Sequence, residues 1–428
     1  MIDIETLYEI YSQHPEVTTD SRHCPQGSIF FALRGENFDG NQFAEKAIEA
    51  GCAYAVVDDA TVVRDDRYLL VENVLTTLQT LARHHRRTLG LPIIGITGTN
   101  GKTTTKELTA ACLSQRFKIL ATEGNLNNAI GVPLTLLRLN ASHEIAVVEM
   151  GASHPGDITE LVEIAEPDYG IITNVGKAHL QGFGSFEGVI ATKCELYDFL
   201  RNHGGKVFLH NENPYLPSRV AGPETILYGT GPGLFVSGSM IQCSPYLSFA
   251  FTYDEHTHTI DTRLIGSYNL TNALAAVAIA SYFGVPAEQI SMAIASYEPR
   301  NRRSQLVKTD RNTLIVDAYN ANPTSMAAAL DNFTAMDMPH KVVLLGDMGE
   351  LGADSRAEHR KIADRLRSDG TIEAYLAGKE FCSVAEGLTT FPDTDALVEF
   401  LQNNPLSGCT ILIKGSRSAK LEKCLDCL

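Results

Sequence analysis

A glycine-rich turn between an apolar strand and a helix is the feature that most constrains this chain. Residues 92–97 form the predicted strand, and the turn and the first helical residues follow as Gly98, Thr99, Asn100, Gly101, Lys102, Thr103 and Thr104. Glycines let backbone N–H groups close around phosphate oxygens, and the helix N-terminus adds favourable partial charge. Ile96 replaces the first glycine of the GxxxxGKS/T pattern, so a plain tight turn is the alternative. The strand–turn–helix order favours a phosphate-binding loop, with Lys102 at the outer phosphates and Thr103 on Mg²⁺.

The hydrophobic pattern predicts an α/β protein of three domains. At about 100 to 200 residues per domain, the 428 residues allow two or three domains. Short apolar runs without alternation, separated by helical stretches, predict a doubly wound and mostly parallel sheet around the phosphate-binding loop, over residues 91–297. Residues 225–261 are more β-rich, and we expect an antiparallel edge there. We expect a small α/β domain at residues 1–90 and a Rossmann-like α/β domain at residues 298–428.

Charge and composition argue against several classes of function. The chain has 35 Lys and Arg residues against 51 Asp and Glu residues, a net charge of −16. This balance disfavours nucleic-acid binding, which relies on basic groups that neutralise phosphates. No apolar run has the length needed to span a bilayer, and no amino-terminal signal pattern is found, so we expect no membrane insertion. The nine cysteines are scattered, which is typical of reduced thiols in a cytoplasmic enzyme.

Three further side chains in the central region are candidates for catalysis. Glu149 ends a predicted strand and can hold the Mg²⁺ of ATP, but a capping role in the next turn fits the sequence equally well. His179 follows another predicted strand, where a neutral imidazole can bind a second divalent ion, although a lone histidine is more often structural. Lys193 lies on a predicted helix at residues 185–200, and the residues alone favour a solvated lysine there.

Polar clusters mark candidate substrate contacts, which are Asn127, Asn128, Asp317, Asn322, Lys414 and Arg417. The two neighbouring asparagines lie in an amide-rich loop that suits a peptide or a sugar, with turn formation as the alternative. Asp317 ends a predicted strand and can accept hydrogen bonds from a ribose, while Asn322 before Pro323 reads as a helix N-cap. The two cations suit a carboxylate or a phosphate. Both C-terminal clusters can also be plain polar loop starts.

The joint order of these motifs resembles that of the Mur ligase family over nearly the whole chain. The motifs that carry the resemblance are Thr19-Asp20-Ser21-Arg22, Ser28–Gly35, Gly98–Thr104, Glu149-Met150-Gly151, Asn174–His179, Thr192–Leu196, Asn269–Asn272, Tyr319–Pro323, Gly346–Gly352 and Lys414–Arg417. Each motif is short, but their order is specific. Two departures are Tyr268, where many members have histidine, and Asn41, where Asp-Gly-His is common.

The resemblance implies an ATP-dependent ligase that forms an amide bond through an acyl phosphate. Its substrates would be UDP-N-acetylmuramoyl-tripeptide and D-alanyl-D-alanine. The product would be the pentapeptide precursor of peptidoglycan, which cell-wall synthesis, cell shape and cell division require. ATP and Mg²⁺ would be needed, and Lys193 would be carbamylated. We expect a monomer, and the third residue of the tripeptide stays open between lysine and diaminopimelate.

The resemblance also implies roles for individual residues. The first domain would bind the UDP end of the substrate near Ser21 and Arg22. Thr103 and Glu149 would hold one Mg²⁺, and His179 with the carbamylated lysine would hold a second. The residues expected near ATP are Asn269, Asn272, Arg303 and Asp317, with Arg300 or Arg302 as alternatives to Arg303. The residues expected near the substrates are Ser21, Arg22, Asn127, Asn128, Tyr319, Asn320, Asn322, Lys414 and Arg417.

Four other interpretations of the sequence compete with an ATP-dependent ligase that adds D-alanyl-D-alanine. A sister ligase would add a single amino acid, but it usually carries an Asp-Asn-Pro-Arg-like motif that this chain lacks. A folylpolyglutamate synthase shares the central fold without the N-terminal nucleotide-binding region. A non-catalytic ATP-binding switch would not need the full set of Lys102, Glu149, His179 and Lys193. A simple P-loop hydrolase would not need the third domain.

Overall fold

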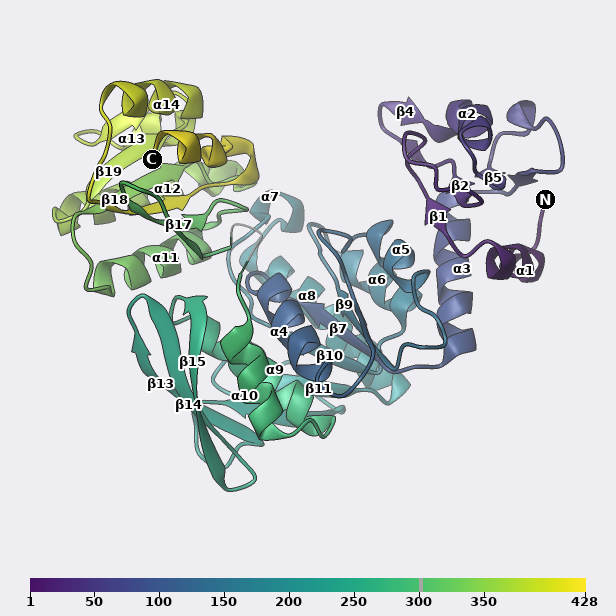
Figure 1. Ribbon diagram of the computed structural model, residues 1–428, viewed down its shortest axis with the longest axis horizontal. Coiled ribbons are helices and arrows are strands. Elements are labelled where there is room, and N and C mark those ends of the chain that lie inside the picture. Colours follow the sequence, from purple (N-terminus) through teal and green to yellow (C-terminus); the bar gives the residue numbers. More distant parts are fainter. Residues whose placement is uncertain (300–302) are drawn as a thin grey trace.

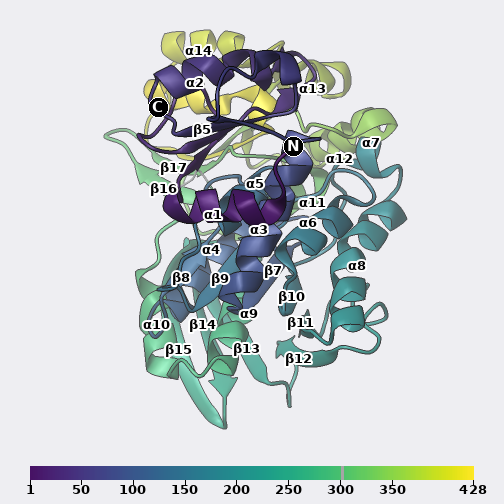
Figure 2. The same ribbon diagram turned by 90° about the vertical axis from the view of Figure 1, so that its right-hand side faces the viewer.

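A computed structural model describes residues 1–299 and 303–428 of the chain. Figure 1 shows three parts in chain order, with the N-terminal part in purple and the C-terminal part in light green and yellow at opposite ends of the molecule. Figure 2 shows that both outer parts lie on the same side of the central sheet. A site on this side can therefore combine residues from more than one part.

The N-terminal part is a small parallel sheet with helices packed on it. Its strands, in spatial order, are β1 (Val17–Thr18), β2 (Ile29–Phe31), β5 (Tyr54–Val57) and β6 (Tyr68–Leu70). Its other elements are α1 (Ile4–Gln13), the hairpin of β3 (Arg34–Gly35) and β4 (Phe38–Asp39), η1 (Gly40–Phe43), α2 (Ala44–Glu49) and η2 (Ala60–Val62). The apolar run at residues 54–57 predicts a strand, and β5 has the same bounds.

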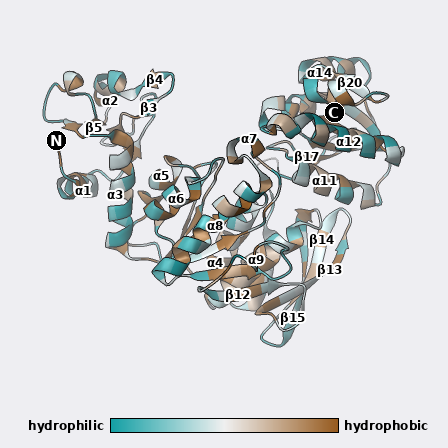
Figure 3. Cartoon of the chain, turned by 180° about the vertical axis from the view of Figure 1, so that it is seen from behind, coloured by the Kyte–Doolittle hydropathy of each residue, from teal (hydrophilic) through white to brown (hydrophobic). Residues whose placement is uncertain are grey.

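A long helix, α3 (Val74–Leu89), carries the chain from this sheet to the central one. It begins where the side chain of Asn73 accepts the N–H of Thr76, and it ends at Gly90 in the left-handed conformation with φ 64°. One side packs against α5 (Gly131–Leu136) and α6 (Asp157–Ala165) of the central part. Much of the helix is hydrophilic in Figure 3, as expected for a helix with one face in solvent.

Within the described residues, the central part contains a nine-stranded sheet. Its strands, in spatial order, are β15 (His256–Ile265), β14 (Tyr246–Tyr253), β13 (Val236–Cys243), β12 (Glu224–Gly229), β11 (Lys206–His210), β10 (Tyr169–Ile172), β7 (Ile93–Thr97), β9 (Ile145–Glu149) and β8 (Ile119–Ala121). The sheet is parallel from β13 to β8, and among the described strands of this sheet only the pairs β13–β14 and β14–β15 are antiparallel. The predicted antiparallel edge therefore exists, but it begins later than residue 225 because β12 pairs in parallel with β11.

Helices cover both faces of this sheet, which confirms the doubly wound arrangement. One face carries α4 (Lys102–Leu113), α9 (Asn269–Tyr282) and α10 (Ala287–Ser296), and the other carries α3, α6 and α8 (Phe186–His203). Strands β7 and β9 are buried along their whole length, which explains their continuous apolar sequence. Strand β8 and helices α5 and α7 (Leu180–Phe183) were not predicted, because they are too short to show a period. Strand β11 and helix α10 were not predicted either.

The C-terminal part is a second α/β unit. Its strands, in spatial order, are β16 (Gln305–Lys308), β17 (Thr313–Asp317), β21 (Thr410–Lys414), β18 (Lys341–Gly346), β19 (Glu373–Ala377) and β20 (Thr389–Phe391). Its helices are α11 (Pro323–Ala335), η3 (Gly352–Asp354), α12 (Ser355–Asp369), α13 (Lys379–Val384), α14 (Thr394–Asn403), η4 (Arg417–Ala419) and η5 (Leu421–Cys427). Strand β16 is antiparallel to β17 and the other pairs are parallel, in keeping with a Rossmann-like unit.

We propose domain boundaries near residues 90 and 297, which fall between the strands of separate sheets. Within the described part of the chain, no helix is long and apolar enough to cross a bilayer.

Candidate active site

A cavity of about 500 Å³ opens where the C-terminal part faces the phosphate-binding loop. Its walls come from the N-terminus of α4, the ends of β9, β10 and β21, the start of α9, and the loop that follows β17. Ligands of open α/β sheets gather at the carboxyl ends of the strands, and this cavity lies there. Most of the predicted ATP, metal and substrate residues therefore share one space.

The turn after β7 is shaped by glycine and held by Asn174. Gly98 has φ 142°, and a Cβ there would lie 2.1 Å from the hydroxyl of Thr173, so no side chain fits. The side chain of Asn174 forms two hydrogen bonds with the backbone of Asn100. Oδ1 accepts the N–H of Asn100 at 3.0 Å, and Nδ2 donates to its carbonyl at 2.9 Å. The turn thus has a fixed shape before any ligand binds.

Lys102 and Thr103 begin α4 directly after this turn. The Lys102 ammonium donates to the carbonyls of Gly98 at 2.8 Å and Thr99 at 3.1 Å, so it lies over the loop. Burial lowers the pKa of Lys102, and the neighbouring charge of Glu149 opposes that shift. Thr103 is only 3% exposed, and it lines the cavity together with Thr104. This arrangement offers one cation and a helix N-terminus to a phosphate chain.

Glu149 lies at the end of β9 with its carboxylate in the cavity wall. The residue is 2% exposed, and Oε1 accepts a hydrogen bond from Nδ2 of Asn127 at 2.8 Å. Oε2 is buried and has no hydrogen-bond partner among the described residues. A buried carboxylate oxygen without a partner is costly, and a divalent cation would satisfy it. Asn127 thus supports Glu149 in addition to facing the cavity.

His179 lines the same cavity, and Lys193 is buried on α8. His179 has a left-handed backbone with φ 49°, and its Nδ1 contacts the carboxylate of Glu350. Burial lowers the pKa of His179, although Glu350 opposes the shift, so the neutral imidazole is favoured. Lys193 is 2% exposed and donates to the carbonyl of Ala152 at 3.5 Å. The solvated lysine that the residues alone favoured is therefore wrong, because Lys193 belongs to a buried run of α8 at residues 192–194.

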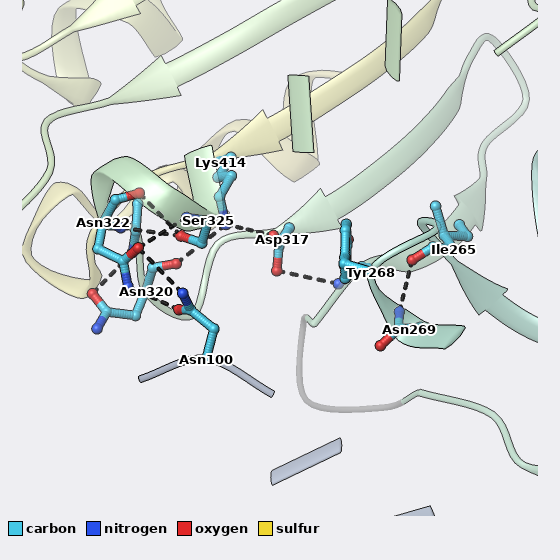
Figure 4. Close-up of polar contacts among 11 residues, drawn as sticks. Asn100, Ile265, Tyr268, Asn269, Asp317, Asn320, Asn322, Ser325 and Lys414 are labelled. Carbon is cyan, nitrogen blue, oxygen red and sulfur yellow. Dashed lines mark hydrogen bonds and ion pairs between the residues drawn. The ribbon is translucent and has the colours of Figure 1, made fainter. Parts of the chain in front are cut away.

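Residues of the C-terminal part reach the loop from the opposite wall, as Figure 4 shows. Nδ2 of Asn322 donates to Oδ1 of Asn100 at 2.8 Å, and Oδ1 of Asn322 accepts the N–H of Ser325 at 2.9 Å. The predicted N-cap at Asn322 is confirmed, as part of a full capping box. In this arrangement the amide joins α11 directly to the phosphate-binding loop.

A second group in this wall pairs a cation with a carboxylate. Nζ of Lys414 lies 2.5 Å from Oδ2 of Asp317 and donates to the carbonyl of Asn320 at 3.4 Å. The guanidinium of Arg303 stacks 3.9 Å from the ring centroid of Tyr319. All five residues line the cavity. Charge on Lys414 is therefore largely neutralised by Asp317 before a substrate arrives.

The predicted asparagines line the cavity, and they also form hydrogen bonds that stabilise the surrounding chain. Asn269 and Asn272 line the cavity, but each is about 5% exposed, and Nδ2 of Asn272 donates to Oδ1 of Asn269 at 2.9 Å. Asn128 lines the cavity too, yet its Oδ1 accepts the N–H of Gly131 at 2.8 Å, at the start of α5. Turn formation, the alternative reading of this asparagine, is thus also present in the structure.

Comparison with known proteins decides the family. Three family models match in order: the Mur ligase family catalytic domain at residues 15–86, the Mur ligase middle domain at 96–280, and the Mur ligase glutamate ligase domain at 302–417. The UDP-N-acetylmuramoyl-tripeptide–D-alanyl-D-alanine ligase of Bacillus subtilis is 36% identical to this chain, over 95% of the chain and 91% of the relative. The chain belongs to the Mur ligase family. Its fold class, α/β in three domains, is confirmed by the same matches.

Two solved Mur ligase structures extend the likeness to the fold. MurF from Acinetobacter baumannii has a TM-score of 0.87 and 30% identity, over 96% of this chain and 92% of that one. MurF from Thermotoga maritima in complex with ADP has a TM-score of 0.86 and 26% identity, over 100% of this chain and 98% of that one. The resemblance read from the motifs is thereby confirmed across the chain.

Three predicted substrate contacts of this Mur ligase do not line the cavity. Ser21 and Arg22 follow β1 in the N-terminal part, where Arg22 pairs with Asp20 at 2.8 Å and has an 83% exposed side chain. Arg417 is exposed at the start of η4. Arg300 and Arg302, the alternatives to Arg303, lie outside the described residues.

Some residues that shape the Mur ligase site were not among the candidates. Asn174 fixes the loop, Thr122 holds the N–H of Glu149 at 2.9 Å, and Glu350 contacts His179. Asn174 and Glu350 stand in motifs of the resemblance, which could have drawn attention to them. Nothing in the sequence singles out Thr122, because its role depends on β8 lying beside β9.

Proposed function

We propose that this chain catalyses the ATP-dependent ligation of D-alanyl-D-alanine to UDP-N-acetylmuramoyl-tripeptide, through an acyl phosphate. The observation that carries the proposal is the relative from Bacillus subtilis, which has that activity in its name and matches 95% of this chain. The cavity supports it, since a phosphate-binding loop on one wall faces amide and charged groups of the C-terminal part on the other. The product is a precursor of peptidoglycan.

ATP fits the phosphate-binding wall of the cavity. The ADP complex of the Thermotoga maritima relative supports nucleotide binding by this fold. The N–H groups of the loop and the N-terminus of α4 would hold the phosphates, and Lys102 would move from the loop carbonyls to the γ-phosphate. Asn269, Asn272, Arg303 and Asp317 line the same cavity and are proposed on the nucleoside side.

The donor set around Glu149 fits magnesium. The orphaned Oε2 of Glu149 and the buried Thr103 are hard oxygen donors, and Mg²⁺ usually binds one or two carboxylates together with phosphate oxygens. No group of three His, Cys, Asp or Glu side chains among the described residues could hold a metal alone. Phosphate oxygens would therefore complete the site. When bound, the metal would neutralise charge on the phosphates.

The surroundings of Lys193 suit carbamylation. Burial, and then the positive charge of Lys102, lower the pKa of Lys193 well below its usual value. The neutral amine can attack CO₂ and lose a proton, which gives a carbamate with two oxygen donors. Together with His179, this group is proposed for a second magnesium ion. The carbamate would place a negative charge near the positive charge of Lys102.

The reaction needs positioning more than acid–base groups. Lys102 would stabilise the charge that develops as the γ-phosphoryl group moves to the terminal carboxylate of the tripeptide. The amine of D-alanyl-D-alanine then attacks the acyl phosphate, and phosphate leaves. Tyr319, Asn320, Asn322, Lys414 and Arg417 are proposed for the dipeptide, whereas Ser21 and Arg22 are proposed for the UDP end. Asn127 and Asn128 are proposed near the peptide.

Phosphate release from ATP, with and without D-alanyl-D-alanine, tests the proposal. In the presence of Mg²⁺ and UDP-N-acetylmuramoyl-tripeptide, we expect release to require the dipeptide and a pentapeptide product to appear by mass. A Lys102→Met variant should lose at least a hundredfold in rate because it removes the main cation at the phosphates. Phosphate release at the same rate with and without the dipeptide would overturn the proposal.

Substrate replacement separates the competing readings. A single amino acid that drives release where the dipeptide does not would identify a sister ligase. Release without any acceptor would identify a hydrolase, and tight ATP binding without release would identify a switch. The same assay with lysine- or diaminopimelate-containing tripeptides decides the third residue. A monomeric state and a cytoplasmic location are part of the proposal.

A further inference from the structure

Lys106 is a buried cation that no predicted role explains. It is 3% exposed on α4, one turn after Lys102 and three residues after Thr103. Its Nζ donates to the carbonyl of Thr122 at 2.7 Å, and Oε1 of Glu107 lies 3.8 Å away. Taking an ammonium out of water is costly, so a lysine at this place needs a reason other than solubility.

Thr122 connects this cation to the strand of Glu149. It is 2% exposed and directly follows β8. Its hydroxyl accepts the N–H of Glu149 at 2.9 Å, and its own N–H donates to the carbonyl of Val147 at 3.0 Å. Thr122 is therefore tied to β9 at two points and to α4 at a third.

The segment that begins with Thr122 also holds the Glu149 side chain. Asn127 donates to Oε1 of Glu149 at 2.8 Å, and its own carbonyl accepts the N–H of Gly151 at 2.7 Å. The bond from Asn127 occupies Oε1, whereas Oε2 has no hydrogen-bond partner among the described residues and is left for a ligand. Both the backbone and the carboxylate of Glu149 thus depend on where the segment 122–127 lies.

We infer that Lys106 is a positioning residue that fixes the separation of Thr103 and Glu149, the two proposed magnesium donors. One of these donors is on α4 and the other is on β9. The Lys106–Thr122 bond, together with the two bonds from Thr122 to β9, links these elements through buried groups. The inference rests on the proposed function. Groups that orient a metal ligand typically change metal affinity by about 10–100-fold when removed.

Magnesium dependence of nucleotide binding tests this role without catalysis. A fluorescent ATP analogue is titrated into wild type and Lys106→Met, first in EDTA and then over a range of Mg²⁺. We expect the half-saturating Mg²⁺ concentration to rise about tenfold or more in Lys106→Met, with binding in EDTA within about twofold of wild type. Lys118→Met is the matched control, since Lys118 is an exposed lysine just beyond the same helix.

Thr122→Val tests the same connection between α4 and β9 at a different atom, the hydroxyl of Thr122. It keeps the carbonyl that Lys106 binds but removes the hydroxyl that holds the N–H of Glu149. We expect the same rise in the Mg²⁺ requirement, and a double variant that is no worse than the stronger single one, because both changes break one path. If Lys106→Met does not fold, Thr122→Val alone decides.

Two outcomes would overturn the inference. One is an unchanged Mg²⁺ requirement in the folded variants, and the other is an equal loss of binding with and without Mg²⁺, as a general structural defect would give. Wild-type ligation that needs no Mg²⁺ would instead contradict the proposed function. The two failures are therefore distinguishable.

Discussion

At the scale of single residues, Lys193 has an amine whose surroundings disfavour its charged form. Burial and the nearby Lys102 lower its pKa, and the described contacts of Nζ are the Ala152 carbonyl and the ring of Phe183 at 5.4 Å. We predict that Lys193→Ala lowers the ligation rate at least a hundredfold, and that short-chain carboxylic acids such as acetate restore part of it. The acid would fill the space of the carbamate and supply its oxygens. Steady-state ligation with increasing acetate measures both effects.

Lys206→Ala is the matched control for that residue. Lys206 pairs with Glu224 at 2.9 Å on strands away from the cavity, so its loss should leave the rate unchanged with or without acetate. Full activity in Lys193→Ala would contradict any role for this amine. A loss that no acid restores would contradict the carbamate.

At the scale of elements, Asn322 has two separable tasks at the start of α11. It caps the helix through Ser325 and reaches Asn100 of the phosphate-binding loop. We predict that Asn322→Ala lowers the free energy of unfolding by about 1 kcal/mol, because the cap is lost. Asn322→Ser should keep most of that stability, since serine also caps, but it is too short to reach Asn100. Both variants should raise the KM for ATP several-fold, as measured by initial rates and by denaturant unfolding.

Elements are also the scale at which the sequence was most informative. Apolar runs predict strands at residues 313–317, 341–346, 373–377 and 410–414, and β17, β18, β19 and β21 have these bounds. The agreement follows because buried parallel strands are continuous apolar runs that end at turn residues. The phosphate-binding loop could be predicted equally well, because its strand, glycines and helix are consecutive in the sequence. The burial of Lys193 could not be predicted, because it depends on how α6, α7 and the central sheet pack against α8. The role of Thr122 could not be predicted for the same reason, because its partners lie on α4 and β9.

At the scale of the whole molecule, contacts between the central and C-terminal parts surround the cavity. Besides the Asn100–Asn322 pair, the N–H of Lys177 donates to the hydroxyl of Thr324 at 3.2 Å. Nζ of Lys177 lies 3.0 Å from Oε1 of Glu358 on α12. Such contacts hold the two parts together while a reactive intermediate is present, and exclusion of water is the main benefit of that closure.

We predict that Lys177→Met increases hydrolysis of the acyl phosphate by water before it lowers the rate of the reaction. The pair with Glu358 is partly exposed and contributes about 0.5 kcal/mol, so the fold should tolerate its loss. A more open interface would admit water to the acyl phosphate, and the ratio of phosphate released to pentapeptide formed should rise above one. Lys361→Met is the matched control, because Lys361 binds the same carboxylate at 2.8 Å from within α12 and does not bridge the parts. A ratio of one in both variants would show that this ion pair does not protect the intermediate, whereas a raised ratio in both would assign the effect to Glu358 itself.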